Sequence, residues 1–189
     1  RRLPELVGLE EVLRIPEGMP LDRTAPLLCA GITTYSPLRR NIKAGDKVGV
    51  VGLGGLGHMA VKIAKAMGAH VTMISHSESK RADANSFGAD DFLNSSEEDV
   101  FKTNAQRFDF ILDTVSAQHD YNAYLGLLRR DGKMVLVGMP DASPIHASSL
   151  VLKRRSLAGS LIGGIKETQE MLDFCAKHKV LSDIEVIPM

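Results

Sequence analysis

Residues 48–57 read Val-Gly-Val-Val-Gly-Leu-Gly-Gly-Leu-Gly, an apolar run that passes directly into glycines spaced as Gly52-x-Gly54-x-x-Gly57. Apolar side chains then recur at helical spacing over about residues 55–67, so the glycines lie between a predicted strand and a predicted helix. In that context Gly52 permits a tight turn, Gly54 has no side chain to hold a diphosphate off the backbone, and Gly57 lets the helix pack closely on the strand. The helix N-terminus adds free N–H groups and the positive end of its dipole. The stretch predicts a dinucleotide-binding turn, with candidate contacts Gly52, Leu53, Gly54, Gly55, Leu56 and Gly57.

The composition of the chain is that of a neutral globular protein. It has 189 residues, of which 44% are apolar, and its 23 Lys and Arg balance its 23 Asp and Glu. This length fits one large domain or one domain with tails. The balanced charge argues against a nucleic-acid partner, and no apolar stretch approaches the roughly 20 residues that span a membrane. No secretory signal is visible, and Cys29 and Cys175 form neither a CxxC motif nor a disulfide framework, so we expect a cytoplasmic protein without a membrane partner.

Strand and helix patterns alternate along most of the chain. We expect strands at about residues 47–51, 70–75, 91–93, 108–115, 133–139 and 156–162. We expect helices within residues 23–40 and at about 55–67, 79–87, 120–130, 148–154 and 166–178. Local motifs add a Ser95-x-x-Glu98 capping box for a brief helix, an Asp131-Gly132 turn and the start of a strand at 184–187. Such alternation predicts an α/β fold with a doubly wound parallel sheet, a Rossmann fold.

The end of the strand at residues 70–75 bears on which dinucleotide binds, because ligands of these sheets lie at the carboxyl ends of the strands. NAD sites usually place Asp or Glu there, whereas this strand ends in Ser75, His76 and Ser77, and Lys80 and Arg81 follow. A 2′-phosphate is repelled by a carboxylate and held by Lys or Arg, so we predict NADP(H) rather than NAD(H). Glu78 works against this assignment, and a solvated helix face is the alternative for Lys80 and Arg81. The predicted contacts on this side are Ser75, His76, Ser77 and Lys80.

Several further stretches carry a family resemblance, among them Leu136-Val137-Gly138 and residues 167–171, which read Glu-Thr-Gln-Glu-Met. Residues 25–38 read Ala-Pro-Leu-Leu-Cys-Ala-Gly-Ile-Thr-Thr-Tyr-Ser-Pro-Leu, residues 113–117 read Asp-Thr-Val-Ser-Ala, and residues 158–164 read Ala-Gly-Ser-Leu-Ile-Gly-Gly. Together with the glycine turn, and in this order, they resemble the zinc-type alcohol dehydrogenases. The similar branch is the cinnamyl-alcohol-dehydrogenase-like one of the medium-chain dehydrogenase/reductase superfamily. The resemblance extends from about residue 12 to residue 189, and residues 1–10 do not share it.

The resemblance implies a role for each matching residue. Cys29 matches a ligand of the catalytic zinc, and Thr33 matches a threonine beside the nicotinamide. The glycine turn matches the diphosphate loop, and residues 75–80 match the 2′-phosphate region. The matches to the ribose and nicotinamide half are Thr114, Gly138, Ser160, Leu161 and Ile162. In such enzymes Zn²⁺ polarises the oxygen of a small-molecule alcohol or aldehyde while a hydride passes to or from NADP(H).

The chain also departs from the family pattern. A catalytic zinc needs three protein ligands, and the second cysteine, the His–Glu pair and the usual four-cysteine structural site of the family's β-rich domain are not in this sequence. We therefore expect residues 1–24 to be a linker from the catalytic domain, residues 25–183 to be the NADP-binding domain, and residues 184–189 to begin the return strand. The isolated chain should bind NADP(H) without turning over alcohol. The resemblance also implies a homodimer formed through about residues 158–162.

Two other function classes stay open. One is a dinucleotide-sensing regulatory module without chemistry of its own, and the other is a different nucleotide-fold enzyme such as a methyltransferase, which Ser75 disfavours because such enzymes often keep an acid there. A short-chain dehydrogenase is disfavoured, since no tyrosine is followed four residues later by lysine.

Several residues have simpler interpretations than a role in chemistry. Cys175 has core spacing on the last helix, and we interpret it as packing. Asp113 is expected to organise a loop, and His58 to be a hydrogen-bonded residue at a helix start. We assign no role to the scattered histidines His70, His119, His146 and His178.

Overall fold

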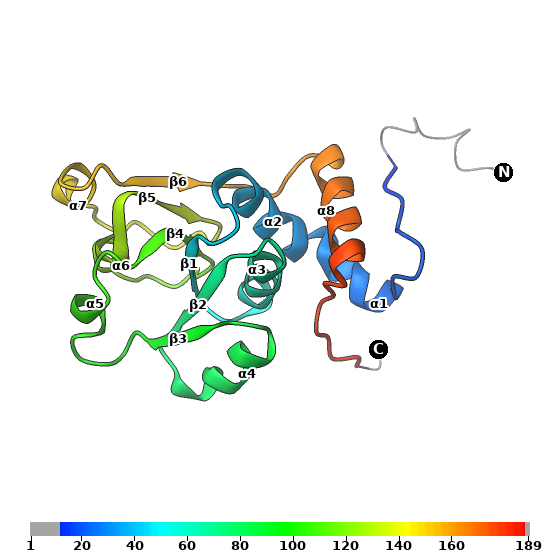
Figure 1. Ribbon diagram of the computed structural model, residues 1–189, viewed down its shortest axis with the longest axis horizontal. Coiled ribbons are helices and arrows are strands. Elements are labelled where there is room, and N and C mark those ends of the chain that lie inside the picture. Colours follow the sequence, from blue (N-terminus) through cyan, green and yellow to red (C-terminus); the bar gives the residue numbers. More distant parts are fainter. Residues whose placement is uncertain (1–11, 188–189) are drawn as a thin grey trace.

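Six parallel strands form one sheet in the spatial order β3-β2-β1-β4-β5-β6. The structure, a computed structural model, describes residues 12–187, so residues 1–11 and 188–189 of the expected terminal segments lie outside it. The strands are β1 (Lys47–Val51), β2 (His70–Ser75), β3 (Asp91–Asn94), β4 (Phe108–Asp113), β5 (Leu128–Leu136) and β6 (Ser156–Gly159). The chain runs outward from β1 to β3, returns to β4 beside β1, and runs outward again to β6 (Figure 1). This reversal between β1 and β4 is that of a doubly wound sheet, and it confirms the predicted Rossmann-like fold.

Helices cover both faces of the sheet. The longer ones are α2 (Ala30–Asn41), α3 (Gly55–Ala66), α6 (Tyr121–Leu127) and α8 (Ile165–His178). Shorter turns of helix are α1 (Leu21–Thr24), η3 (Ala25–Leu28), η4 (Glu78–Lys80), α4 (Arg81–Ser86), α5 (Val100–Thr103) and α7 (Ala147–Val151). No helix within residues 12–187 has both the length and the apolar character that crossing a membrane requires.

The pleat of β1 explains why its sequence is apolar throughout. Val48 and Val50 belong to a core cluster that includes side chains of α2, α3 and α8, whereas Val51 belongs to a second cluster with α6. Successive side chains of a strand point to opposite faces of the sheet. Because both faces of a parallel sheet are covered, the strand reads as a continuous apolar run rather than as an alternating one.

Several predicted boundaries were wrong where tertiary pairing overrides a local pattern. The helix expected at 120–130 ends at Leu127, because Leu128 pairs with Phe108 and begins β5. The Asp131-Gly132 pair does not separate two elements: Asp131 has φ 63° inside β5, beside a register shift in the β4–β5 pairing. The strands expected to reach residues 115, 139 and 162 end instead at Asp113, Leu136 and Gly159.

The capping box at Ser95 was also wrong. The backbone N–H of Ser95 donates to the carbonyl of Ser75 at 2.8 Å, which continues the β2–β3 pairing and keeps this residue out of a helix. The brief helix begins later, at Val100, after Asp99 with φ 62°. Residues 184–187 form no strand.

Candidate functional site

A groove of about 740 Å³ runs along the carboxyl edge of the sheet. Three segments line it: the turn after β1, the residues after β2 and the loop after β4. It brings together most of the residues that the sequence predicted as cofactor contacts, namely Gly52, Leu53, Gly54, Gly55, Leu56, Ser75, His76, Ser77, Lys80 and Thr114. The groove thus lies where the strand order reverses, the usual ligand position in such sheets.

The turn between β1 and α3 owes its shape to glycine at two positions. Gly52 has φ 88°, and a Cβ there would lie 2.6 Å from Cγ2 of Val115. A Cβ on Gly57 would lie 1.9 Å from the carbonyl oxygen of Gly52, so α3 can approach the turn only because that atom is absent. Gly52 is further fixed by its N–H, which donates to the carbonyl of Ile74 at 2.9 Å.

Gly54 differs from these two glycines because a Cβ there would meet no heavy atom within 4 Å. It lines the groove and precedes the first residue of α3, and its side chain position is open space that a ligand can occupy. No side chain caps the N-terminus of α3. The first N–H groups of this helix have no intrahelical partner, so they are available to an anion in the groove. The turn therefore fits a diphosphate.

The groove wall after β2 carries no carboxylate. Ser75, His76, Ser77 and Lys80 line it, and the hydroxyls of Ser77 and Ser79 lie 2.8 Å apart. Lys80 has no ion-pair partner among residues 12–187. The wall offers hydroxyl donors and a cation, the groups that a phosphate monoester requires.

Arg81 and Glu78, which the sequence placed among these residues, form an ion pair with each other. The Arg81 hydrogen bond lowers the pKa of Glu78 and keeps that carboxylate ionised. Neither residue lines the groove.

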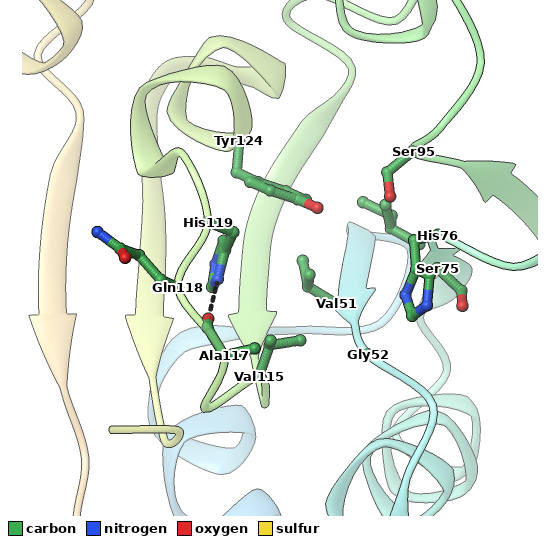
Figure 2. Close-up of a pocket in the computed structure, with 11 residues that line it drawn as sticks. Val51, Gly52, Ser75, His76, Ser95, Val115, Ala117, Gln118, His119 and Tyr124 are labelled. Carbon is green, nitrogen blue, oxygen red and sulfur yellow. Dashed lines mark hydrogen bonds between the residues drawn. The ribbon is translucent and has the colours of Figure 1, made fainter. Parts of the chain in front are cut away.

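A second hollow of about 270 Å³ adjoins the groove, between the end of β2 and the loop after β4 (Figure 2). The two share Gly52, Ser75, His76, Val115 and Ala117. Its far wall contains His119 and Tyr124, and the Tyr124 hydroxyl points toward the side where Ser95 lies (Figure 2).

We assigned no role to His119 from the sequence, and the structure places its ring in hydrogen-bond contact with Asp113. Its Nε2 lies 2.7 Å from Oδ2 of Asp113, whose Oδ1 accepts the N–H of Val115 at 3.0 Å. The hydrogen bond that His119 donates to Asp113 raises the pKa of His119, against the opposing effect of burial. Asp113 organises the loop as predicted. The signal for the pair was weak, because a spacing of six residues across a loop does not by itself imply contact.

His58, in the first turn of α3, lacks a hydrogen-bond partner from the described part of the chain at one of its two ring nitrogens. Its Nε2 is buried and has no hydrogen-bond partner among the described residues, so the expectation of a hydrogen-bonded histidine was wrong for this nitrogen. The ring packs against Phe87 with centroids 5.6 Å apart. Burial lowers the pKa of His58, which favours the neutral imidazole.

The remaining predicted site residues do not line the groove. Thr33 is buried in α2, and Gly138 packs so closely on the loop after β4 that a Cβ would lie 2.3 Å from the carbonyl oxygen of Val115. The N–H of Ser160 donates to the carbonyl of Leu136 at 3.0 Å and so extends the β5–β6 pairing by one bond. Leu161 is 81% exposed, and Ile162 has φ 44°.

The two cysteines differ in environment. Cys29 is exposed immediately before α2. Within residues 12–187 no three His, Cys, Asp or Glu side chains are grouped as a metal site, so the described residues do not fit a zinc ion. Cys175 packs in the core as expected, and burial raises its pKa to about 12.

Comparison with known proteins agrees with this geometry. The sequence model of the zinc-binding dehydrogenase family matches residues 55–177. The chain is 58% identical over 182 residues to a mannitol dehydrogenase of Petroselinum crispum, covering 94% of this chain and 54% of that protein. It is 56% identical over 172 residues to the aldehyde reductase YahK of Escherichia coli, covering 88% of this chain and 49% of that protein. The chain thus spans about half the length of the curated relatives that it matches.

Solved structures give the same result. A cinnamyl alcohol dehydrogenase of Sorghum bicolor superposes with a TM-score of 0.91 at 47% identity, over 96% of this chain and 52% of that one. The CAD of Helicobacter pylori, solved in complex with NADP(H), superposes with a TM-score of 0.85 at 44% identity, over 94% and 51% of the two chains. This chain belongs to the zinc-binding dehydrogenase family, and it corresponds to the nucleotide-binding half of its cinnamyl-alcohol-dehydrogenase-type, medium-chain members.

Proposed function

We propose that this chain is the cofactor-binding part of an NADP(H)-dependent alcohol dehydrogenase or aldehyde reductase. The observation that carries the proposal is the groove itself. It has open space at Gly54, uncapped N–H groups at the start of α3, and Lys80 in a wall that carries no carboxylate from residues 12–187. Lys80 also lines a neighbouring hollow together with Asp83, Asp183 and Glu185. The NADP(H) complex of the Helicobacter pylori CAD and an NADP-dependent alcohol dehydrogenase of Mycolicibacterium smegmatis at 57% identity support the same cofactor.

Different residues of the chain are proposed to bind different parts of the cofactor. The N–H groups after Gly54 receive the diphosphate, while Lys80 with Ser75 and Ser77 receives the 2′-phosphate. Thr114 is proposed to face the ribose. Its Oγ1 donates to the carbonyl of Val51 at 2.8 Å and so holds the loop after β4 against the end of β1.

The nicotinamide half supplies hydride chemistry when the cofactor is bound. Its proposed contacts on this chain are Thr33, Gly138, Ser160, Leu161 and Ile162. Cys29 is proposed as one zinc ligand of the whole enzyme, and the described residues give no complete site through which a step could be derived.

The organisation proposed with this function is a linker at residues 1–24, a dinucleotide domain at 25–183 and a return to the catalytic domain at 184–189. A homodimer is proposed through about residues 158–162, because β6 is one of the two edge strands of the sheet. Edge strands present unpaired N–H and C=O groups that a second copy can pair with.

A fluorescence titration of the purified chain with NADPH and NADH tests the cofactor. NADPH should bind more tightly, and Lys80→Ala should weaken NADPH by about tenfold, as expected for loss of one charge-assisted hydrogen bond, while leaving NADH unchanged. The matched control is Lys102→Ala, which removes a lysine that is 84% exposed on α5. Tighter binding of NADH, or equal effects of the two substitutions, would refute the assignment.

A further inference from the structure

The imidazole of His119 has a hydrogen-bond partner at each nitrogen. Nδ1 lies 2.8 Å from the carbonyl oxygen of Ala117, and Nε2 lies 2.7 Å from Oδ2 of Asp113 (Figure 2 shows the first of these bonds). The Asp113 side chain is 1% exposed and that of His119 is 15% exposed. Water therefore has little access to either group.

Both partners of the ring are acceptors, which fixes where the protons lie. A carbonyl oxygen can only accept, so Nδ1 carries a proton. The Asp113 carboxylate accepts from the N–H of Val115 and from Nε2, so the second nitrogen also donates. Imidazole is a stronger base than a carboxylate, so the shared proton stays on the ring. The arrangement is that of an imidazolium paired with a carboxylate.

This ion pair closes the loop that forms one wall of the groove. Asp113 is the last residue of β4, His119 precedes α6, and Ala117 lies between them. The ring, at one end of the loop, thus bonds both to the other end at Asp113 and to Ala117 within the loop. Val115 and Ala117 face the groove and the adjoining hollow, so the position of this wall depends on the ring.

The other titratable groups around the ring are few. Among the described residues, Asp120 follows it at the start of α6, and Tyr121 and Tyr124 pack on it in T-shaped contacts with centroids 4.8 Å and 5.2 Å away. Burial raises the pKa of both tyrosines, so both stay neutral through the range where a histidine titrates. His76 lines the opposite wall of the hollow.

We propose that His119 is a positioning residue for the dinucleotide: as an imidazolium it clamps the loop after β4 against Asp113, and cofactor affinity falls when the ring loses a proton. This inference rests on the proposed function. A neutral ring has one N–H for two acceptors, so either the Ala117 carbonyl or the Asp113 carboxylate loses its partner. The wall is then held by fewer bonds, and affinity decreases as the pH rises.

The protonation state is measured directly by long-range ¹H–¹⁵N NMR of the wild-type chain. The spectrum at pH 7 should show protons on both ring nitrogens of His119, and these should persist above the ordinary histidine pKa of about 6.5. A bare nitrogen on His119 at pH 7 would overturn the inference. This measurement needs no variant and no cofactor.

The effect on binding is measured by NADPH titrations from pH 7 to pH 9.5, a range above the second pKa of a phosphate monoester at about 6. Wild-type affinity should fall by about fivefold across the range, the lower end of typical coupling between sites. His119→Gln keeps one donor but cannot titrate, so its profile should be flatter, with weaker binding at pH 7. His146→Gln is the matched control and should follow the wild type.

A third variant separates the two histidines of the hollow. His76→Gln should keep the wild-type slope even if its affinity changes. A slope that disappears in His76→Gln and persists in His119→Gln would overturn the role of His119. Absence of NADPH binding at pH 7 in the wild type would instead refute the proposed function, which keeps the two failures distinct.

Discussion

The turn after β1 and the loop after β4 meet at the carboxyl edge of the sheet, and different interactions fix their conformations. The turn after β1 is shaped by missing side chains, since a Cβ on Gly52 or Gly57 would overlap atoms already there. The loop after β4 is held by side chains that are present, those of Asp113 and His119. The first loop therefore depends on sterics and is insensitive to pH, whereas the second depends on a proton.

The largest expected effect is on the first loop. Gly57→Ala puts a Cβ 1.9 Å from the Gly52 carbonyl oxygen, so the turn must open. We expect a loss of about 3 kcal/mol in the free energy of unfolding, measured with urea, and loss of NADPH binding. Gly126→Ala is a matched control because Gly126 is also helical, in α6, and a Cβ there meets nothing within 4 Å. Equal unfolding midpoints for the two variants would contradict the steric account.

The second effect concerns the loop after β4, whose contribution to the unfolding free energy should decrease as the pH rises. The folded-state pKa of His119 is raised, so the stabilisation from its ion pair is fully present below the unfolded value of about 6.5 and is lost as the pH rises through the folded value. Asp113→Asn should cost about 2 kcal/mol of unfolding free energy at pH 6 and clearly less at pH 9.5. Urea unfolding at the two pH values measures the difference, with Asp141→Asn as an exposed control. A cost that is constant with pH would show that no titrating pair holds the loop.

The third effect separates binding from folding within the glycine turn. A Cβ at Gly54 enters open space, so Gly54→Ala should change the unfolding free energy by no more than about 0.5 kcal/mol. The same atom keeps the diphosphate away from the N–H groups of α3, and we expect NADPH to bind about tenfold more weakly, equivalent to one lost hydrogen bond to a charged group. The titration is run beside Gly126→Ala. Unchanged NADPH affinity would place the diphosphate elsewhere.

The smallest expected effect is at the edge of the groove. Glu78→Gln removes an exposed carboxylate and releases Arg81 from its ion pair. NADPH should bind about twofold more tightly, in line with the small energies of exposed charge pairs, and NADH should not change. The gain should disappear in high salt, since exposed charges are screened. A gain that high salt leaves intact would mean that Glu78 acts through something other than its charge.

The contrast between a turn shaped by sterics and a loop held by side chains also explains which features could be predicted from the sequence. The bounds of β1 and β2 were predicted correctly, because strands covered on both faces are marked by continuous apolar runs. The glycine turn was predictable because local geometry requires Gly52 and Gly57, and a diphosphate requires the open space at Gly54. Leu127 and Leu128 fit a helix face as well as a strand, so the start of β5 could be decided only by pairing with β4.

Side-chain pairs that span a loop are harder to predict. Asp113 and His119 are ordinary residues in the sequence, and only the folded loop brings them to 2.7 Å. Ser95 shows the reverse case, in which a valid local motif is overridden because its N–H is already bonded to Ser75. Residues 160–162 resemble a strand end, but the last β5–β6 hydrogen bond is that of the Ser160 N–H, and Ile162 has φ 44°.

We propose that the groove holds the diphosphate at the glycine turn and a 2′-phosphate at Lys80. Calorimetric titration with 2′-phospho-ADP-ribose and with ADP-ribose tests it most directly, because the two ligands differ only in that phosphate and neither requires the nicotinamide contacts. Both ligands should bind, and the phosphorylated one should bind at least about tenfold more tightly. Equal affinities, or tighter binding of ADP-ribose, would contradict it.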